Sequence, residues 1–197
     1  MNATPAPASP AWRDAAIARL PAVPLEDGRS LRELAEALRD VARQPDTPRA
    51  DDRAFADGDG YRRFLLARLP HAEALLIWWP PGYGTPVHDH DRLWGIELVL
   101  DGMLVVDEYA VQAGATGAEG LHLERRPSVR LPRGAARLFD DPGYAHACHN
   151  AFFDRPALSL HVYGGPLERY RRFERDGAGW RVSEVRPALV RDADGTA

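Results

Sequence analysis

Gly82-Tyr-Gly-Thr-Pro-Val-His88-Asp-His90 is the segment from which the architecture of this chain is inferred, and Gly143-Tyr-Ala-His146-Ala-Cys-His-Asn150 complements it later in the sequence. On an extended strand, residues i and i+2 point to the same face, so His88 and His90 are expected to bind one ion together. With His146 they make three neutral imidazoles, a set that suits a first-row divalent metal and leaves coordination positions open. The alternative is that these histidines are surface or hydrogen-bonded core residues.

The residues after His90 predict a β-hairpin. Trp94–Leu100 and Met103–Tyr109 are two apolar runs separated by Asp101-Gly102, a dipeptide that favours a tight hairpin turn. From Tyr61 onward the chain consists of short apolar runs broken by proline and glycine. This texture is typical of an all-β barrel.

The spacing of glycines and histidines resembles the two sequence motifs of the cupin superfamily. The pattern is G-x5-H-x-H, then Gly102 twelve residues after His90, then G-x2-H-x3-N. The resemblance implies an antiparallel jelly-roll barrel with a metal inside. Cupins normally place a glutamate ligand about five residues after the second histidine, where this chain has Gly95. Glu97 lies two residues further on, so a shifted carboxylate ligand stays open.

Before the barrel the pattern is helical. Ala11–Leu20 is expected to form a short helix and Ser30–Ala42 a longer one, with Ser30 as N-cap and Glu33 completing a capping box. Residues 44–60 are polar and rich in Asp, Pro and Gly, which predicts a linker. We therefore expect an all-β fold with N-terminal helices: a helical segment, 1–55, packing on a cupin barrel, 56–197, in a single structural domain.

Composition excludes several classes of function. Lysine is absent among the 25 basic residues, which excludes Schiff-base chemistry and a P-loop lysine. The net charge of −4 gives no indication of a nucleic-acid partner. A single cysteine, Cys148, allows no internal disulfide, and no membrane-spanning run or signal-peptide core is present, so a cytoplasmic location is expected. The oligomeric state stays open between a monomer and a small homo-oligomer.

A third segment with potentially reactive side chains is Ala157-Leu-Ser-Leu-His-Val-Tyr163. On a strand, Ser159, His161 and Tyr163 share one face. One interpretation is an edge strand with its polar side in water. The other is a hydrogen-bonded Ser-His-Tyr relay that faces the metal cavity.

Two segments together resemble the bacterial thiol dioxygenases: this one, whose His161 lies fifteen residues after His146, and Pro-Val-His-Asp-His. These are the cysteine dioxygenase family and its 3-mercaptopropionate dioxygenase branch, and the resemblance spans about Tyr61 to Arg172. It implies an Fe(II)-dependent enzyme that adds O2 to the sulfur of a small carboxylated thiol to give a sulfinate. The resemblance assigns His88, His90 and His146 as iron ligands, and Ser159, His161 and Tyr163 as catalytic residues.

Gly95 also marks a departure from part of this family. The mammalian cysteine dioxygenases have a cysteine at this position, crosslinked to the tyrosine that corresponds to Tyr163. Because Gly95 has no thiol, no such crosslink is expected here. Cys148 shares the strand parity of His146 and is expected to be a small buried apolar residue.

A carboxylated substrate requires a cation, ideally an arginine. By resemblance, Arg63 matches the carboxylate-binding arginine of cysteine dioxygenases, whereas Arg172, with its neighbour Arg171, matches the mercaptopropionate branch. The alternative for each is a solvated surface charge. If two arginines reach the pocket, a dicarboxylate thiol such as mercaptosuccinate becomes the expected substrate.

Two other classes of function remain open. One is a different cupin enzyme, such as a carbon–carbon-cleaving dioxygenase or an isomerase, which Glu97 as a fourth ligand would favour. The other is a metal-binding cupin without turnover. Neither class requires the Ser-His-Tyr strand, so that strand favours a thiol dioxygenase.

Overall fold

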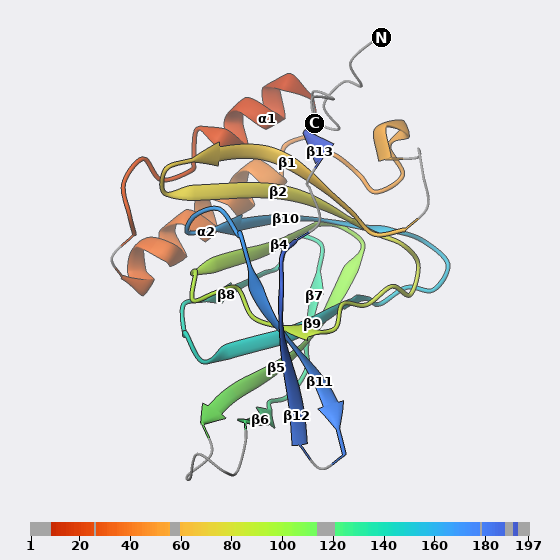
Figure 1. Cartoon of the computed structure of the whole chain (residues 1–197). Helices are drawn as coiled ribbons and strands as arrows, with labels where there is room; N and C mark the ends of the chain where they lie inside the picture. Colours follow the sequence, from red (N-terminus) through yellow and green to blue (C-terminus); the bar gives the residue numbers. More distant parts are fainter. Residues whose placement is uncertain are drawn as a thin grey trace.

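The computed structural model describes residues 9–25, 27–55, 60–113, 121–177, 179–187 and 191–192. Two β-sheets face each other, and two helices lie on the outer side of one of them (Figure 1). The helices are α1 (Pro10–Ile17), α2 (Gly28–Ala42) and a short 3-10 helix, η1 (Arg53–Phe55).

The first sheet has the order β13 (Arg191–Asp192), β1 (Arg62–Leu69), β2 (Ala72–Trp79), β10 (Ala157–Tyr163), β4 (Gly95–Asp101) and β8 (Ala136–Phe139). The second has the order β12 (Gly179–Val185), β11 (Tyr170–Asp176), β3 (Val87–His88), β9 (Tyr144–Asn150), β5 (Met103–Ala113) and β6 (Leu121–Arg125), with β7 (Val129–Pro132) paired to β5. Neighbouring strands are antiparallel except β13, which runs parallel to β1. The prediction of an all-β fold with N-terminal helices is confirmed.

The central strands β2, β10 and β4 are buried on both faces, which explains their nearly continuous apolar sequences. Even-numbered side chains pack outward against the helices, and odd-numbered ones point into the space between the sheets. Both sets contribute to core clusters. The outer cluster contains Leu76, Leu98, Leu160 and the helix residues Leu34 and Leu38, and the inner cluster contains Leu75, Ile77, Val99 and Tyr163.

The start of α2 differs from the prediction. The N-cap is Asp27, not Ser30, because Asp27 is extended (φ −147°, ψ 161°) and its side chain accepts the backbone N–H of Ser30 at 2.8 Å. Ser30 therefore lies inside the first turn, and the capping box predicted with Glu33 is wrong. The first helix is shorter than predicted: α1 begins at Pro10, capped by Ser9, and ends at Ile17.

The connections around the barrel agree in part with the predictions. The β4–β5 hairpin turns at Asp101-Gly102, where Gly102 has φ +83°. The predicted linker contains η1, and Ala50 and Phe55 within it are buried; residues 56–59 lie outside the described part of the chain. The helices described here are all too short or too polar to cross a membrane.

Candidate metal centre and active site

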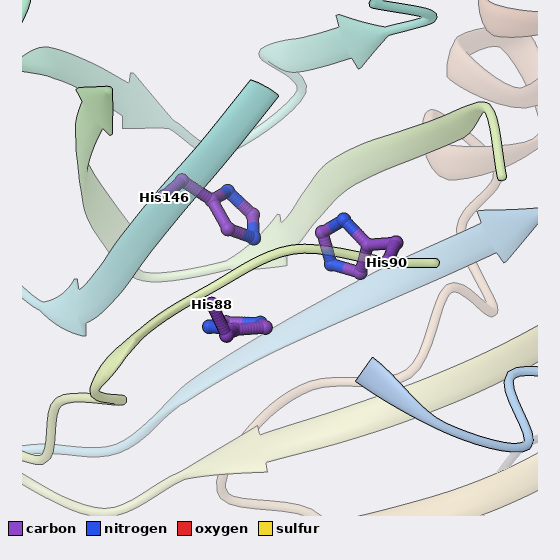
Figure 2. Close-up of side chains that lie close together, drawn as sticks. All are labelled: His88, His90 and His146. Carbon is purple, nitrogen blue, oxygen red and sulfur yellow. The ribbon is translucent and has the colours of Figure 1, made fainter. Parts of the chain in front are cut away.

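Three histidines from two segments meet between the sheets (Figure 2). His88 is the last residue of β3 and lies opposite His146 of β9 in the strand register. His90 follows two residues later, and its ring lies 5.1 Å from that of His88 and 4.8 Å from that of His146. One nitrogen from each ring lies within 4.8 Å of those of the other two. The structure therefore brings together the three residues predicted to bind a metal.

His88 and His90 do not both lie on one strand as predicted, because β3 ends at His88. The chain then turns through Asp91 and Arg92, both with positive φ (50° and 67°). The intervening Asp89 is buried and accepts the backbone N–H of Arg171 at 2.8 Å and its Nε–H at 2.5 Å. This carboxylate, which sequence reasoning did not identify, attaches the histidine segment to β11.

All three imidazoles are neutral around pH 7. Burial lowers the pKa of His88, and lowers that of His90 and His146 well below the ordinary value. Nδ1 of His88 lies 2.9 Å from the carbonyl oxygen of Pro86, so a proton at Nδ1 leaves the Nε2 lone pair for a metal. Three neutral nitrogens at this spacing fit a divalent transition metal.

Aromatic rings enclose the histidines. Phe139 stacks on His90 with centroids 4.4 Å apart and an interplanar angle of 17°, and Tyr170 contacts His88 edge-to-face at 5.5 Å. Gly95 makes the first contact possible, because a Cβ there would lie 2.1 Å from Cζ of Phe139. The absence of a side chain at Gly95, the position that departs from the cupin pattern, thus leaves the space that the Phe139 ring occupies.

Ser159, His161 and Tyr163 form a continuous hydrogen-bonded line on β10. Ser159 Oγ lies 2.9 Å from Nε2 of His161, and Nδ1 of His161 lies 3.2 Å from the Tyr163 hydroxyl. Trp79, which the sequence did not single out, donates its indole N–H to Ser159 Oγ at 2.8 Å. Because β10 lies between β2 and β4 and is buried throughout, the interpretation as a solvent-facing edge strand is wrong.

The line lies beside the histidine cluster. The Tyr163 ring is 5.1 Å from the ring of His90, and Tyr163 is a buried residue. Burial raises the pKa of Tyr163 above the ordinary value, so the phenol keeps its proton. Burial also lowers the pKa of His161 to about 3, so this imidazole is neutral and carries one N–H.

Glu97 and Cys148 lie behind His146. The Cys148 thiol donates to one oxygen of Glu97 at 3.0 Å, and the other oxygen lies 3.7 Å from Nδ1 of His146. These three residues form a second close group of possible metal ligands. Cys148 is buried, as expected, but it borders a carboxylate as well as apolar side chains.

The three predicted substrate arginines differ in their surroundings. Arg63 on β1 is partly buried and makes no hydrogen bond or ion pair with another described residue. After burial, its positive charge is the next cause that lowers the pKa of His161, and it acts in the same direction on His88 and His90. Its charge therefore acts on histidines of both the cluster and the relay.

The two β11 arginines point to opposite faces. Arg172 lies opposite His88 in the strand register; one of its terminal nitrogens pairs with Glu174 at 2.7 Å, and its buried Nε has no hydrogen-bond partner in the described structure. Arg171 is held by Asp89 and lines a hollow of about 430 Å³ with Asp89, Asp91, Arg92 and Pro142. That hollow contains none of the three histidines.

Three aromatic residues belong to the inner core cluster or pack against it. Tyr61 stacks on Tyr83 at 4.9 Å and meets Trp79 edge-to-face at 5.1 Å. Sequence reasoning missed these three residues. For Trp79 a signal was present, because it lies two residues after Ile77 on β2 and shares its inner face.

Comparison with solved structures finds several chains of low similarity. A hydroquinone 1,2-dioxygenase in complex with Cd²⁺ and 4-hydroxybenzonitrile is 20% identical, with a TM-score of 0.43, over 56% of this chain and 69% of that chain. A hydroquinone 1,2-dioxygenase from Sphingomonas sp. TTNP3 with 4-hydroxybenzoate bound is 17% identical (TM-score 0.42; 57% and 71% covered). The cupin domain of Schizosaccharomyces pombe Cnp3 is 14% identical (TM-score 0.41; 55% and 67% covered).

The family comparison is decisive. The model of the family described as cysteine dioxygenase type I matches residues 34–176, well over half of the chain, and this range includes the three histidines and the whole relay. Family and histidine cluster together support a metal-dependent cupin dioxygenase. The chain belongs to the cysteine dioxygenase type I family.

Proposed function

We propose that this protein is an Fe(II)-dependent thiol dioxygenase that converts a small carboxylated thiol to its sulfinate. The thiol sulfur is oxidised and O2 supplies both new oxygen atoms, so no separate reductant is needed. His88, His90 and His146 would hold the iron. When bound, Fe(II) supplies the Lewis acidity and redox chemistry that a thiol and O2 require.

The observation that carries the proposal is the buried Ser159–His161–Tyr163 line ending beside the histidine cluster. A cupin that only stores a metal needs no such line. Trp79 can only donate, so Ser159 Oγ accepts from it. We assign the Ser159 hydroxyl proton to Nε2 of His161, which puts the imidazole proton on Nδ1, where it donates to the Tyr163 oxygen.

In this arrangement the Tyr163 O–H stays free to donate into the cavity. It would hydrogen-bond the thiol sulfur or the developing sulfinate oxygen, whose negative charge increases during the reaction. His161 and Ser159 would fix the direction of that O–H. Because the phenol stays protonated, it acts as a hydrogen-bond donor over the whole physiological pH range.

Arg63 is the best-supported partner for the substrate carboxylate. It is partly buried, no acidic group among the described residues pairs with it, and its charge acts on His88 and His161. A bound carboxylate would neutralise this charge and form charge-assisted hydrogen bonds. Arg171 is a weaker candidate, because Asp89 already occupies its guanidinium.

A second substrate class is favoured by Arg172. Its unpartnered Nε and its position opposite His88 provide a further cation on the face that carries a metal ligand. Two arginines suit a thiol with two carboxylates. The second candidate function is therefore oxygenation of a dicarboxylate thiol such as mercaptosuccinate.

Oxygen uptake by the Fe(II)-loaded protein tests the proposal with four thiols: cysteine, 3-mercaptopropionate, mercaptosuccinate and cysteamine, which lacks a carboxylate. We expect sulfinate formation with the carboxylated thiols and little with cysteamine. Arg63→Met should lower kcat/KM for every carboxylated thiol by at least about 10-fold. Arg172→Met should have an effect of that size only if the preferred substrate is the dicarboxylate.

Arg130→Met, at an exposed site on β7, is the matched control and should change no kinetic constant. A preference for cysteamine over the carboxylated thiols would contradict the role of the arginines. Absence of oxygenation of every thiol, with iron bound, would contradict the proposed reaction.

A further inference from the structure

One buried carboxylate inside the barrel lacks a full set of partners. Glu97 is completely buried, and one of its oxygens, Oε2, makes no hydrogen bond within the described residues. The other oxygen, Oε1, accepts the thiol S–H of Cys148 at 3.0 Å. A buried carboxylate oxygen without a donor costs folding free energy, so a donor is expected nearby.

The donor that the geometry offers is a metal-ligand imidazole. Nδ1 of His146 lies 3.7 Å from the unpartnered oxygen, slightly beyond hydrogen-bond distance. Glu97 reaches it because β4 and β9 belong to opposite sheets and both side chains point inward. On its own sheet, Glu97 lies opposite His161 in the register, with Nε2 of that ring 3.6 Å from Oε1.

We propose that Glu97 is a positioning residue for the metal centre: it accepts the Nδ1–H of His146, so that Nε2 faces the metal, while Cys148 holds its other oxygen. A histidine that binds a metal nearly always donates its second N–H to a carboxylate, carbonyl or water. The inference rests on the metal centre of the proposed function and not on its thiol substrate.

Two competing acceptors lie near Nδ1 of His146: the Sγ of Cys148 at 3.5 Å, a weak acceptor whose S–H donates to Glu97, and the Tyr144 hydroxyl at 3.4 Å. This hydroxyl donates to Glu108 at 3.0 Å, and Glu108 is already paired with Arg137. A neutral phenol oxygen accepts a hydrogen bond less strongly than a carboxylate does. Glu97 is therefore the stronger partner for the imidazole N–H.

Two other roles for Glu97 give different results in experiment. If Glu97 were a direct ligand in the histidine site, any uncharged variant of Glu97 would lose metal affinity to the same extent. As part of a separate site with Cys148 and Nδ1 of His146, it would add a second metal ion per chain.

Titration of the metal-free protein with Co²⁺, followed by visible absorption, separates these roles. Glu97→Leu removes the acceptor and should weaken Co²⁺ binding by about 10- to 100-fold and shift the absorption bands. Glu97→Gln retains an acceptor oxygen and should stay within a few-fold of the wild type, with unchanged bands. Cys148→Ser retains a donor and should behave like Glu97→Gln.

Glu73→Gln is the matched control. Glu73 is also buried in the first sheet, but it pairs with Arg68 and contacts none of the three histidines, so its variant should bind Co²⁺ like the wild type. Unchanged Co²⁺ affinity in Glu97→Leu would overturn the proposal. Equal losses in Glu97→Gln and Glu97→Leu, or two Co²⁺ ions per wild-type chain, would overturn it as well.

If Glu97→Leu does not fold, the nuclear magnetic resonance of the His146 Nδ1–H proton in the Zn²⁺-loaded wild type and Glu97→Gln decides the question. A strong carboxylate acceptor should move this resonance downfield in the wild type relative to the amide variant; identical shifts would contradict the proposal. Neither assay contains thiol or O2. A failure of thiol oxygenation therefore leaves the positioning role standing, and a failure of the positioning role leaves the reaction standing.

Discussion

At the scale of single residues, the site depends on imidazoles kept neutral by burial. His161 shows the consequence most clearly: with a pKa of about 3 it cannot serve as a cationic acid near pH 7. In the function proposed above, His161 would transmit orientation from Ser159 to Tyr163 through hydrogen bonds. Tyr163 is the member of the relay from which an O–H remains available to the cavity.

Replacing Tyr163 by Phe tests this assignment. The variant loses the hydroxyl but keeps the ring that packs against His90, so we expect sulfinate formation to fall by about 100-fold. Iron content should stay unchanged, because Tyr163 is not one of the clustered ligands. The measurement is oxygen uptake per bound iron.

Tyr109→Phe is the control, because Tyr109 packs against Trp180 away from the histidines. Wild-type turnover by the Tyr163 variant would contradict its catalytic role. Loss of iron from that variant would indicate a structural role.

At the scale of elements, a few strands and one cap determine where these residues lie. β10 places three polar residues inward because it is a central strand with alternating faces. α2 covers the other face of the same sheet. The helix is held at its start by Asp27, which accepts from the backbone of Ser30.

Asp27→Ala should lower the free energy of unfolding by about 1 kcal/mol, because the N–H of Ser30 loses its acceptor. Ser30→Ala should be close to neutral, since its side chain is not the cap. Urea denaturation of both variants checks the assignment. The reverse order of stabilities would show that Ser30 is the cap after all.

Gly95→Ala should destabilise the protein by about 1–3 kcal/mol, because its Cβ would overlap the ring of Phe139. Since that ring stacks on His90, Co²⁺ binding should weaken too. Thermal unfolding and Co²⁺ titration are the measurements. Adding Phe139→Leu should recover part of the lost stability; a single variant as stable as the wild type would show that Phe139 moves aside freely.

The sequence was sufficient for features set by local spacing and insufficient for those set by packing between strands. The Asp101-Gly102 turn follows from its dipeptide, and the shared face of Ser159 and Tyr163 follows from strand periodicity. For His88 and His90, strand periodicity applies only as far as His88, where β3 ends. The ion pair between Arg171 and Asp89 could not be predicted, because the two residues are 82 positions apart in sequence. The contact of Glu97 with His146 likewise requires two sheets to face each other.

At the scale of the whole molecule, burial of neutral histidines couples folding to pH. Below about pH 6.5 the unfolded chain binds protons that the folded metal-free protein excludes, because the pKa of each of His88, His90, His146 and His161 is lowered by burial. For His161 alone this costs about 2 kcal/mol at pH 5. Glu97 acts in the opposite direction, since burial raises its pKa to about 7 and its contribution is lost as the pH rises from 4.5 to 7.

The four histidines destabilise the folded state as the pH falls, and only Glu97 opposes them. The metal-free protein should therefore lose stability steeply as the pH falls from 6.5 to 5. Urea denaturation at several pH values measures this slope. His161→Gln removes one of the four groups and should give a shallower slope. Stability that is constant or increases toward pH 5 would show that the histidines are protonated in the folded state.

In the proposed reaction, both atoms of O2 reach the sulfur of a carboxylated thiol at the three-histidine site. Mass spectrometry of the sulfinate formed by the Fe(II)-loaded protein under ¹⁸O2 tests it most directly, with His146→Ala as the control that lacks a ligand. We predict a product in which both sulfinate oxygens carry the label, and none with the control. A disulfide product, a sulfinate labelled at one oxygen only, or equal product from the control would contradict the claim.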